Sequence, residues 1–213
     1  MLLARAGRHG LERRQRRLLT SYYDTHADAF IAGTRDADMS RLRRRFAVAL
    51  PQPAGVPARI LDAGCGSGRD ARAFTEAGLA TEAFDASPRI VTAATHHAGV
   101  AVRPMTFEQF AWEHPFEGIL ACASLLHVAE SDLPEVLSRL VAHLVPGGVL
   151  YASFKVGPGE RTEEERRFTD MTEDRLGALL DGCESIDRRE MWRSRDVRRE
   201  RSEAWLNALA WVT

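Results

Sequence analysis

Few features of this sequence point to a secreted, membrane-spanning or metal-binding protein. Its three cysteines, Cys65, Cys122 and Cys183, are far apart and show no Cys-x-x-Cys or Cys/His spacing. A disulfide framework or a zinc site is therefore not indicated, and we expect no bound metal. No run of about 18 apolar residues occurs, and the apolar run after Met1 is too short for a signal peptide. These absences favour a soluble, cytoplasmic protein.

Charge of one sign is also lacking, because the formal net charge of the 213-residue chain is −1 at pH 7. No overall field therefore favours nucleic acid or a membrane surface as a partner. The chain has 29 lysine and arginine residues together, and Lys155 is the only lysine among them. Arginines cluster within residues 13–17 and 193–201. We interpret these clusters either as an anion-binding face, which leaves RNA as a less favoured partner, or as a solvated surface.

The length suits one domain, which would bury about 70% of the surface that its unfolded chain exposes. Residues 11–50 carry apolar side chains at helical spacing, with a break at Gly33-Thr34. Prolines within residues 51–57 form a linker that cannot continue a helix. We therefore predict an N-terminal helical cap over residues 1–57, which belongs to the same domain as the main unit over residues 58–213.

After the linker, apolar runs of about five residues alternate with amphipathic segments, as expected for strand–helix–strand units on a parallel sheet. The predicted strands are 59–62, 80–84, 100–104, 118–123 and 149–154. The predicted helices are 69–77, 88–97, 132–144 and 172–180. Two last apolar runs, 185–192 and 203–211, are predicted to be closing strands, with a helix at 205–209 as the alternative.

A glycine-rich turn, Asp62-Ala-Gly-Cys-Gly-Ser-Gly68, follows the first predicted strand. Ligands of open parallel sheets bind beyond the carboxyl ends of the strands, and glycines let them approach the backbone closely. A dinucleotide fingerprint would place a glycine where Arg69 stands, so a nicotinamide-dependent oxidoreductase is disfavoured. Asp85 lies about 20 residues after Gly64, where a carboxylate can accept hydrogen bonds from both ribose hydroxyls of an adenosine.

The run Ile60–Gly68 resembles the first motif of class I S-adenosylmethionine (SAM)-dependent methyltransferases, and Asp85 matches their ribose-binding acid. Pro146-Gly147-Gly148 is also similar to that family. The resemblance implies an α/β fold with a Rossmann-like sheet of about seven strands, helices on both faces and an N-terminal helical cap. It implies SAM as the cofactor and S-adenosylhomocysteine (SAH) as the product. The motif Tyr151–Lys155 resembles small stand-alone bacterial methyltransferases, with a more distant similarity to tellurite-resistance methyltransferases.

The resemblance also implies a set of cofactor-binding residues in the glycine loop, after the next three strands and on the cap. They are Asp62, Gly64, Cys65, Gly66, Gly68, Asp85, Ala86, Met105, Thr106, Phe107, Ala123, Ser124, Tyr22 and Tyr23. Asp62 is expected to hold the loop and the methionine amino group, or simply to bond loop amides as a buried acid. Tyr22 and Tyr23 are predicted to form a lid over SAM, and the alternative is that one tyrosine packs while the other is exposed.

His127, after the fourth predicted strand, is the candidate general base, because the pKa of an unperturbed imidazole suits proton transfer at neutral pH. The alternative is a histidine that only packs or forms a hydrogen bond. Further candidates for the acceptor pocket are Trp192, Arg195, Arg198, Trp205 and Asn207. The predicted function is methyl transfer from SAM to a small molecule by in-line displacement, in a monomer or homodimer. The alternatives are an RNA or protein methyltransferase and a non-catalytic SAM-binding module.

Overall fold

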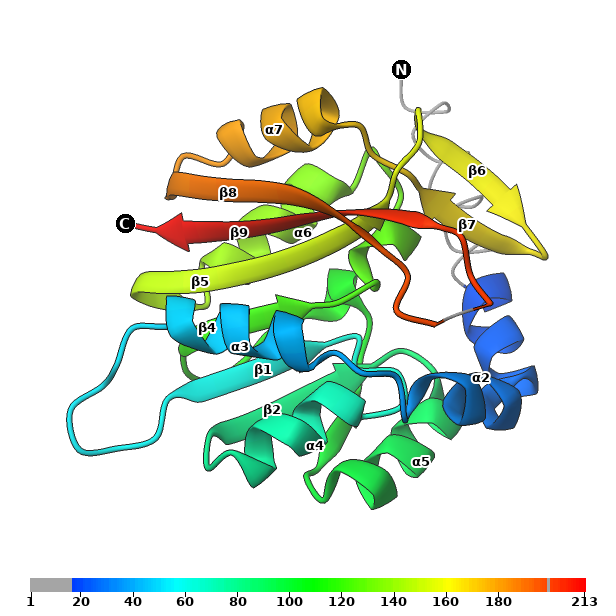
Figure 1. The fold of residues 1–213 in the computed structure, drawn as a ribbon, viewed down its shortest axis with the longest axis horizontal. Coiled ribbons are helices and arrows are strands. Elements are labelled where there is room, and N and C mark those ends of the chain that lie inside the picture. Colours follow the sequence, from blue (N-terminus) through cyan, green and yellow to red (C-terminus); the bar gives the residue numbers. More distant parts are fainter. Residues whose placement is uncertain (1–16, 199) are drawn as a thin grey trace.

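A seven-stranded mixed sheet forms the centre of the computed structural model, which describes residues 17–198 and 200–213 (Figure 1). The strand order is β3-β2-β1-β4-β5-β9-β8. The strands are β1 (Arg59–Ala63), β2 (Ala80–Asp85), β3 (Val102–Pro104), β4 (Phe116–Ala121), β5 (Leu144–Lys155), β8 (Ile186–Arg195) and β9 (Ala204–Val212). The first five are parallel neighbours, and β9 and β8 complete the sheet in antiparallel pairing. The prediction of about seven strands is confirmed, and the alternative helix at 205–209 is wrong because β9 pairs with β5 and β8 there.

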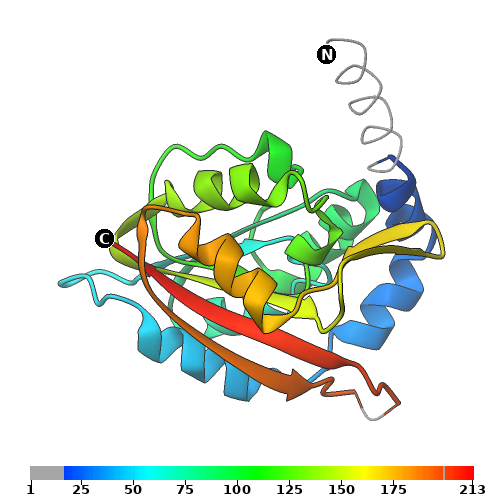
Figure 2. The same cartoon turned by 90° about the horizontal axis from the view of Figure 1, so that it is seen from above.

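Helices cover both faces of this sheet, as predicted. They are α2 (Ala27–Thr34), α3 (Ser40–Ala49), α4 (Arg69–Glu76), α5 (Pro88–Ala98), α6 (Leu133–Val141) and α7 (Glu173–Asp181), with 3₁₀ turns η1 (Phe107–Gln109) and η2 (Leu125–His127). Strand side chains alternate between the faces. Leu61 packs in the cluster that includes residues of α6 and α7, whereas Ile60 packs in the cluster that includes Phe46 of α3. Figure 2 shows α3 on the opposite side of the sheet from α6 and α7.

The N-terminal segment lies over the carboxyl ends of the parallel strands. Residues 17–25 are helical and continue through a turn at His26 into α2. A two-stranded hairpin, β6 (Glu160–Glu163) with β7 (Arg166–Thr169), stands beside this segment in both views (Figures 1 and 2). The predicted break near Gly33-Thr34 is confirmed, because α2 ends at Thr34. Residues 11–16 of the predicted helical stretch, with their arginines, lie outside the described residues.

Local capping explains where α5 begins and ends. The Ser87 hydroxyl accepts a hydrogen bond from the Ile90 amide, and Pro88 follows as the first helical residue. Gly99 ends the helix in the left-handed conformation, with φ of +70°. The helix predicted over residues 88–97 is therefore confirmed.

Two parts of the chain differ from the sequence-based expectation. The fifth strand was predicted over residues 149–154, but β5 begins at Leu144 and includes Pro146-Gly147-Gly148, because Leu144 already pairs with Phe116. The register shift between Phe116 and Gly118 absorbs the extra residues as a bulge. The β6–β7 hairpin was not predicted. None of the described helices is long and apolar enough to cross a membrane.

Candidate functional site

A cavity of about 630 Å³ opens at the carboxyl ends of the parallel strands. It lies where the strand order reverses between β1 and β4, which is the expected ligand position in an open α/β sheet. The glycine loop after β1 and the ends of β2, β4 and β5 line it from the sheet side. Residues of the N-terminal helical segment and of the β6–β7 hairpin complete the lining, so the site is assembled from much of the chain.

The glycine loop passes directly under the segment that follows β4. The amides of Gly64 and Cys65 donate hydrogen bonds to the Phe84 carbonyl at 2.9 and 3.0 Å, which ties the loop to β2. Gly64 has φ of +71°, and a Cβ there would lie 2.6 Å from the Cβ of Ser124. Both the backbone conformation and the close contact therefore require glycine at this position.

Asp85 ends β2 beside this loop. Its Oδ2 accepts a hydrogen bond from the Gly66 amide and its Oδ1 one from the Ser87 amide, both at 3.0 Å. Burial raises the pKa of Asp85, and these backbone hydrogen bonds oppose that rise. A carboxylate offers about four acceptor positions, so its backbone bonding leaves room for hydroxyl donors of a ligand.

Asp62 is buried under the loop and accepts a hydrogen bond from the Ala71 amide at 3.0 Å. Burial and the neighbouring Asp70 raise the pKa of Asp62 well above its usual range, while Arg69 opposes the rise. Arg69 also donates to the Thr34 carbonyl at 3.3 Å, which connects the loop to α2. Asp62 thus fixes the start of α4 to β1, and its contact with a ligand amino group stays a prediction.

The wall near the end of β3 is largely apolar. The Met105 amide donates to the Asp85 carbonyl at 2.9 Å, and the Phe107 ring meets Phe84 edge-on at 5.2 Å between centroids. Met105, Thr106 and Phe107 all line the cavity beside Ala86. This wall offers a planar ligand apolar surface next to the Asp85 carboxylate.

His127 lines the cavity in a defined tautomer. Its Nδ1 is 2.8 Å from the Arg167 carbonyl, which only accepts, so Nδ1 carries the hydrogen. Its Nε2 therefore accepts the hydrogen bond from the Tyr23 hydroxyl, also at 2.8 Å. Burial lowers the pKa of His127 to about 4 and raises the pKa of Tyr23 to about 12. The pair is neutral over the physiological pH range.

Ala123 and Ser124 hold the segment before His127 against the sheet. The Ser124 hydroxyl donates to the Ala63 carbonyl at 2.7 Å, and the Ala123 amide donates to the Ser153 hydroxyl at 2.8 Å. Burial raises the pKa of the Cys122 thiol to about 12, so this thiol stays protonated. These residues shape the wall and supply no activated nucleophile.

The structure brings all but two of the sequence-predicted site residues to the cavity. Gly68 is not part of the lining, because it packs where a Cβ would lie 3.0 Å from the Cβ of Ala98 on α5. Tyr22 also points away from it, and its hydroxyl donates to Glu164 of the hairpin turn at 2.9 Å. Adjacent residues of a helix face different directions, so only Tyr23 reaches the cavity. The candidates for the acceptor pocket all line the cavity: Trp192, Arg195, Arg198, Trp205 and Asn207.

Sequence reasoning missed several lining residues. Phe30 covers the loop, where a Cβ on Gly66 would lie 3.1 Å from its ring. Arg166 and Phe168 come from the hairpin that was not predicted. Lys155 ends β5 and lines the cavity. It is the only lysine in the sequence, and this exception could have identified it as a candidate site residue.

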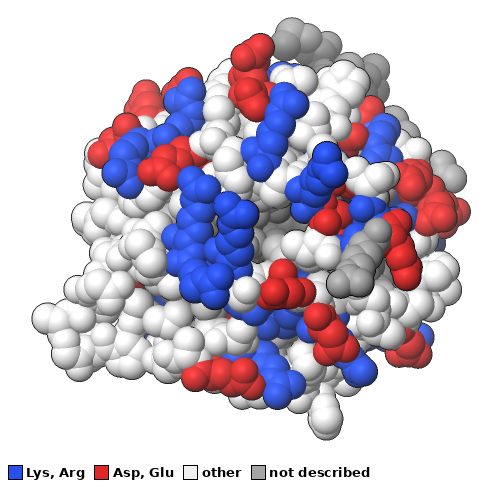
Figure 3. Space-filling model, viewed as in Figure 1, with Lys and Arg blue, Asp and Glu red and all other residues white. Residues whose placement is uncertain are grey.

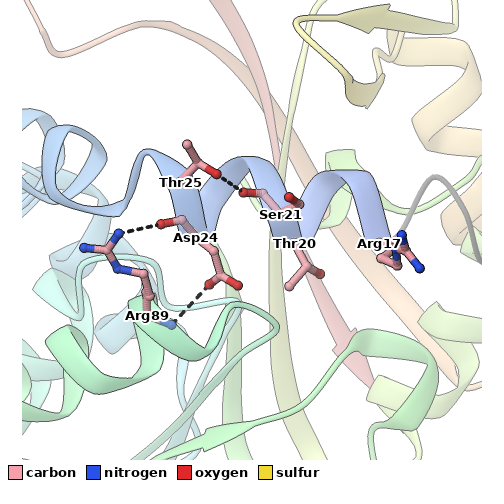
Figure 4. Close-up of a pocket in the computed structure, with 6 residues that line it drawn as sticks. All are labelled: Arg17, Thr20, Ser21, Asp24, Thr25 and Arg89. Carbon is pink, nitrogen blue, oxygen red and sulfur yellow. Dashed lines mark hydrogen bonds between the residues drawn. The ribbon is translucent and has the colours of Figure 1, made fainter.

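The N-terminal segment is anchored outside the cavity by Asp24, whose carboxylate accepts hydrogen bonds from the Ser87 hydroxyl and the Arg89 amide. The Arg89 guanidinium returns a hydrogen bond to the Asp24 carbonyl at 3.1 Å. Figure 4 shows these two residues in a second groove, between residues 17–25 and the start of α5. The anchor sits at a helix N-terminus, where a carboxylate is stabilised. In the described part of the chain, no cluster of three His, Cys, Asp or Glu residues could hold a metal ion.

Comparison with known proteins gives one family match. A family described as a methyltransferase domain matches residues 31–199. The ubiquinone biosynthesis O-methyltransferase of Caulobacter vibrioides is 38% identical over 101 residues, which cover 44% of this chain and 39% of that protein. The enzyme of the same name from Xanthomonas axonopodis pv. citri is 32% identical over 123 residues, 54% of this chain and 49% of that protein. The chain thus matches about half or less of the length of these relatives.

Solved structures resemble the whole fold. The 1,6-didemethyltoxoflavin-N1-methyltransferase of Burkholderia thailandensis, with 1,6-didemethyltoxoflavin and SAH bound, superposes with a TM-score of 0.74 at 24% identity. The match covers 95% of this chain and 90% of that one. A phosphoethanolamine N-methyltransferase of Haemonchus contortus gives a TM-score of 0.72 at 16% identity, covering 93% of this chain and 60% of that one. These likenesses confirm the fold that the sequence predicted.

Proposed function

We propose that this chain, which belongs to the family of methyltransferase domains that matches its residues 31–199, transfers a methyl group from SAM to a small-molecule acceptor. The observation that carries the proposal is the pairing of the glycine loop with Asp85 in one cavity. Gly64 and Gly66 of the loop line the cavity next to Asp85, which retains acceptor positions for two hydroxyls. This arrangement fits an adenosine without a pyrophosphate.

The chain's own residues divide into those that hold the cofactor and those that face the acceptor. Asp85 would bind the ribose, Met105–Phe107 would flank the adenine, and Asp62 would support the amino-acid end. When bound, SAM supplies the activated methyl group, so the protein contributes positioning and electrostatics. Correct alignment of the reacting atoms can lower the barrier by roughly 7–11 kcal/mol.

His127 is proposed as the group that orients the acceptor. Its Nε2 lacks a hydrogen, so it can accept a hydrogen bond from an acceptor O–H or N–H in place of the Tyr23 hydroxyl. The low pKa makes His127 a weak proton acceptor, so its proposed part is alignment more than complete proton removal.

A small-molecule acceptor is favoured over RNA or protein, because the N-terminal segment and the β6–β7 hairpin both contribute to the lining of the cavity. The exposed hydrogen bond from Tyr22 to Glu164 joins these two elements, and a polymer would have to separate them to enter between them. Three arginines of the C-terminal cluster also form ion pairs with carboxylates. Its ion pairs are Arg193–Glu173, Arg198–Asp196 and Arg201–Glu203. On the face shown in Figure 3, acidic side chains are interspersed among the basic ones, apart from one basic group near the centre.

The test is calorimetric titration with SAM and with SAH. We expect Asp85→Ala to weaken binding by roughly 2–4 kcal/mol, because two hydrogen bonds to a charged group are lost. Asp187→Ala is the matched control, since Asp187 is an exposed carboxylate on β8 that does not line the cavity. Absence of SAM and SAH binding by the unaltered chain would refute the proposal, and unchanged affinity in Asp85→Ala would refute the ribose assignment.

Methyl transfer itself is tested with methyl-labelled SAM and a small-molecule extract. Formation of SAH together with a labelled product of low mass supports the enzyme, whereas SAH binding without turnover supports the non-catalytic alternative. We also propose a cytoplasmic location, which the three unpaired cysteines support because thiols persist in reducing compartments.

A further inference from the structure

Two basic side chains, Lys155 and Arg166, line the cavity together with His127. All three contact one aromatic ring, that of Phe168. The Lys155 Nζ is 4.6 Å from the ring centroid, the Arg166 Cζ is 5.1 Å from it, and the His127 ring centroid is 5.0 Å from it. The proposed acceptor site therefore has two cations beside the imidazole that would orient the acceptor.

The protein only partly neutralises Lys155. Its side chain is 16% exposed, and the nearest carboxylate, Glu203, lies 3.4 Å away and also pairs with Arg201 at 3.6 Å. Every other basic residue of the chain is arginine, so lysine at the end of β5 is an exception to the composition. A compact ammonium suits a single anionic group in a confined space.

Arg166 is also incompletely bonded. One terminal nitrogen donates to Glu164 at 2.7 Å, but the Glu164 side chain is 64% exposed, which makes this a weak ion pair. The Arg166 Nε is buried and has no hydrogen-bond partner among the described residues. Such an unpaired buried donor is unfavourable, and a ligand acceptor reached by a small rotation of the guanidinium would offset this cost.

The chemistry indicates which part of the acceptor these cations should meet. The methyl moves from a cationic sulfur to an electron-rich atom, so charge on the attacking atom falls as the new bond forms and the bond to sulfur breaks. Cations bonded to the attacking atom would stabilise its starting state more than the transition state and slow the reaction. Cations bonded to a separate group of the acceptor position it without this penalty.

We infer that the acceptor carries a carboxylate, distinct from the atom that receives the methyl group, which binds between Lys155 and Arg166 while the reacting atom faces His127. This inference rests on the proposed function, because it assigns the substrate class of the same site. The Phe168 ring, which both cations contact, and Tyr23 and Trp205 in the same lining favour a carboxylate on an aromatic ring.

The test uses benzoate as the probe and benzamide as its uncharged isostere. Each is titrated into the chain with and without saturating SAH, and binding is followed by ligand-observed NMR. We expect benzoate to bind more tightly than benzamide. Lys155→Met and Arg166→Met should each raise the Kd of benzoate about tenfold, which corresponds to about 1.4 kcal/mol. Benzamide binding should change little in either variant.

Arg167→Met is the matched control. Arg167 precedes Phe168 in the same strand, but its side chain does not line the cavity and pairs with Glu160 at 3.6 Å. Equal binding of benzoate and benzamide, no detectable benzoate binding, or an unchanged Kd in Lys155→Met would each overturn the inference. Failure of SAH to bind would instead count against the proposed function, and the titrations without SAH would still decide whether the anion subsite exists.

Discussion

Gly64 is the residue at which the backbone of the glycine loop leaves least freedom. An alanine there must adopt a φ near +71° and place its Cβ 2.6 Å from that of Ser124. The left-handed conformation costs about 1–2 kcal/mol for a non-glycine residue, and the collision adds to that cost. We expect Gly64→Ala to lower the free energy of unfolding by about 2–4 kcal/mol and to abolish measurable SAH binding, as followed by denaturant titration and calorimetry.

Gly78→Ala separates the two causes. Gly78 ends α4 with φ of +84°, but a Cβ there meets nothing within 4 Å. It should therefore show only the conformational cost of about 1–2 kcal/mol and retain SAH binding. Equal destabilisation of the two variants would contradict a steric role for Ser124.

His127 should make the stability of the chain depend on pH. Its folded-state pKa of about 4 lies below the ordinary value of 6.5, so between these values the unfolded chain binds more protons. Its contribution is therefore fully present above pH 6.5 and is lost as pH falls toward 4. The free energy of unfolding should be measured by urea denaturation at pH 7.5 and at pH 5 in the natural chain and in His127→Gln. We expect it to fall by about 2 kcal/mol more in the natural chain than in the variant as the pH is lowered.

The comparison of the two chains is needed because other groups titrate with the opposite sign. Burial raises the pKa values of Asp62 and Asp85, so these carboxyls favour the folded state as pH falls. They are common to both chains and cancel in the difference. Identical pH profiles for the natural chain and His127→Gln would show that the imidazole is not buried in its neutral form.

At the scale of secondary-structure elements, one carboxylate anchors the N-terminal segment. Asp24 accepts hydrogen bonds from the Ser87 hydroxyl and from the Arg89 amide at the start of α5, and Figure 4 shows the bond from Arg89. It therefore connects the N-terminal segment to the sheet side. Asp24→Ala should cost about 1–2 kcal/mol of local stability, as loss of a capping carboxylate does. Amides of residues 20–34 should then exchange with solvent roughly tenfold faster or more, which hydrogen-exchange mass spectrometry measures.

Asp28→Ala provides the control on the same face. Its carboxylate pairs with Arg89 at 3.2 Å but is 90% exposed, so the pair should contribute less than about 1 kcal/mol. Exchange of the segment in Asp28→Ala should stay near that of the natural chain. If the protection of these amides from exchange is unchanged in Asp24→Ala, then packing, and not this anchor, holds the segment in place.

Elements with clear periodicity were predictable and the hairpin was not. The five parallel strands and α5 follow from apolar runs, caps and glycine stops, which are local signals. The β6–β7 turn instead places Glu164 and Glu165 at φ of +48° and +65°, a conformation for which asparagine and glycine are the usual signal. Because the sequence has neither asparagine nor glycine at these two positions, it did not indicate the hairpin. The cavity residues Arg166 and Phe168 were therefore not predicted either.

At the scale of the whole molecule, strand order decides which predicted residues meet. Asp85 and the glycine loop could be placed together from sequence, because both follow parallel strands whose carboxyl ends share one edge. The pairing of Tyr23 with His127 joins residues 104 positions apart through the docking of a helix, which no local pattern encodes. The meeting of the glycine loop with Asp85 was therefore predictable from sequence, whereas the Tyr23–His127 pairing and the hairpin residues Arg166 and Phe168 were not.

Because the cavity draws on segments from Leu19 to Asn207, a ligand that fills it should stabilise the folded chain as a whole. SAH at about 100 times its Kd should add about 2.7 kcal/mol, which raises Tm by roughly 5–10 °C for a chain of this size. In Asp85→Ala at the same SAH concentration, the gain should fall to about 1 kcal/mol or less, while Asp187→Ala should keep it. NAD at the same concentration should leave Tm unchanged, because Arg69 stands where a dinucleotide site needs glycine. A larger Tm shift with NAD than with SAH, measured by differential scanning fluorimetry, would contradict the cofactor assignment and favour the oxidoreductase alternative.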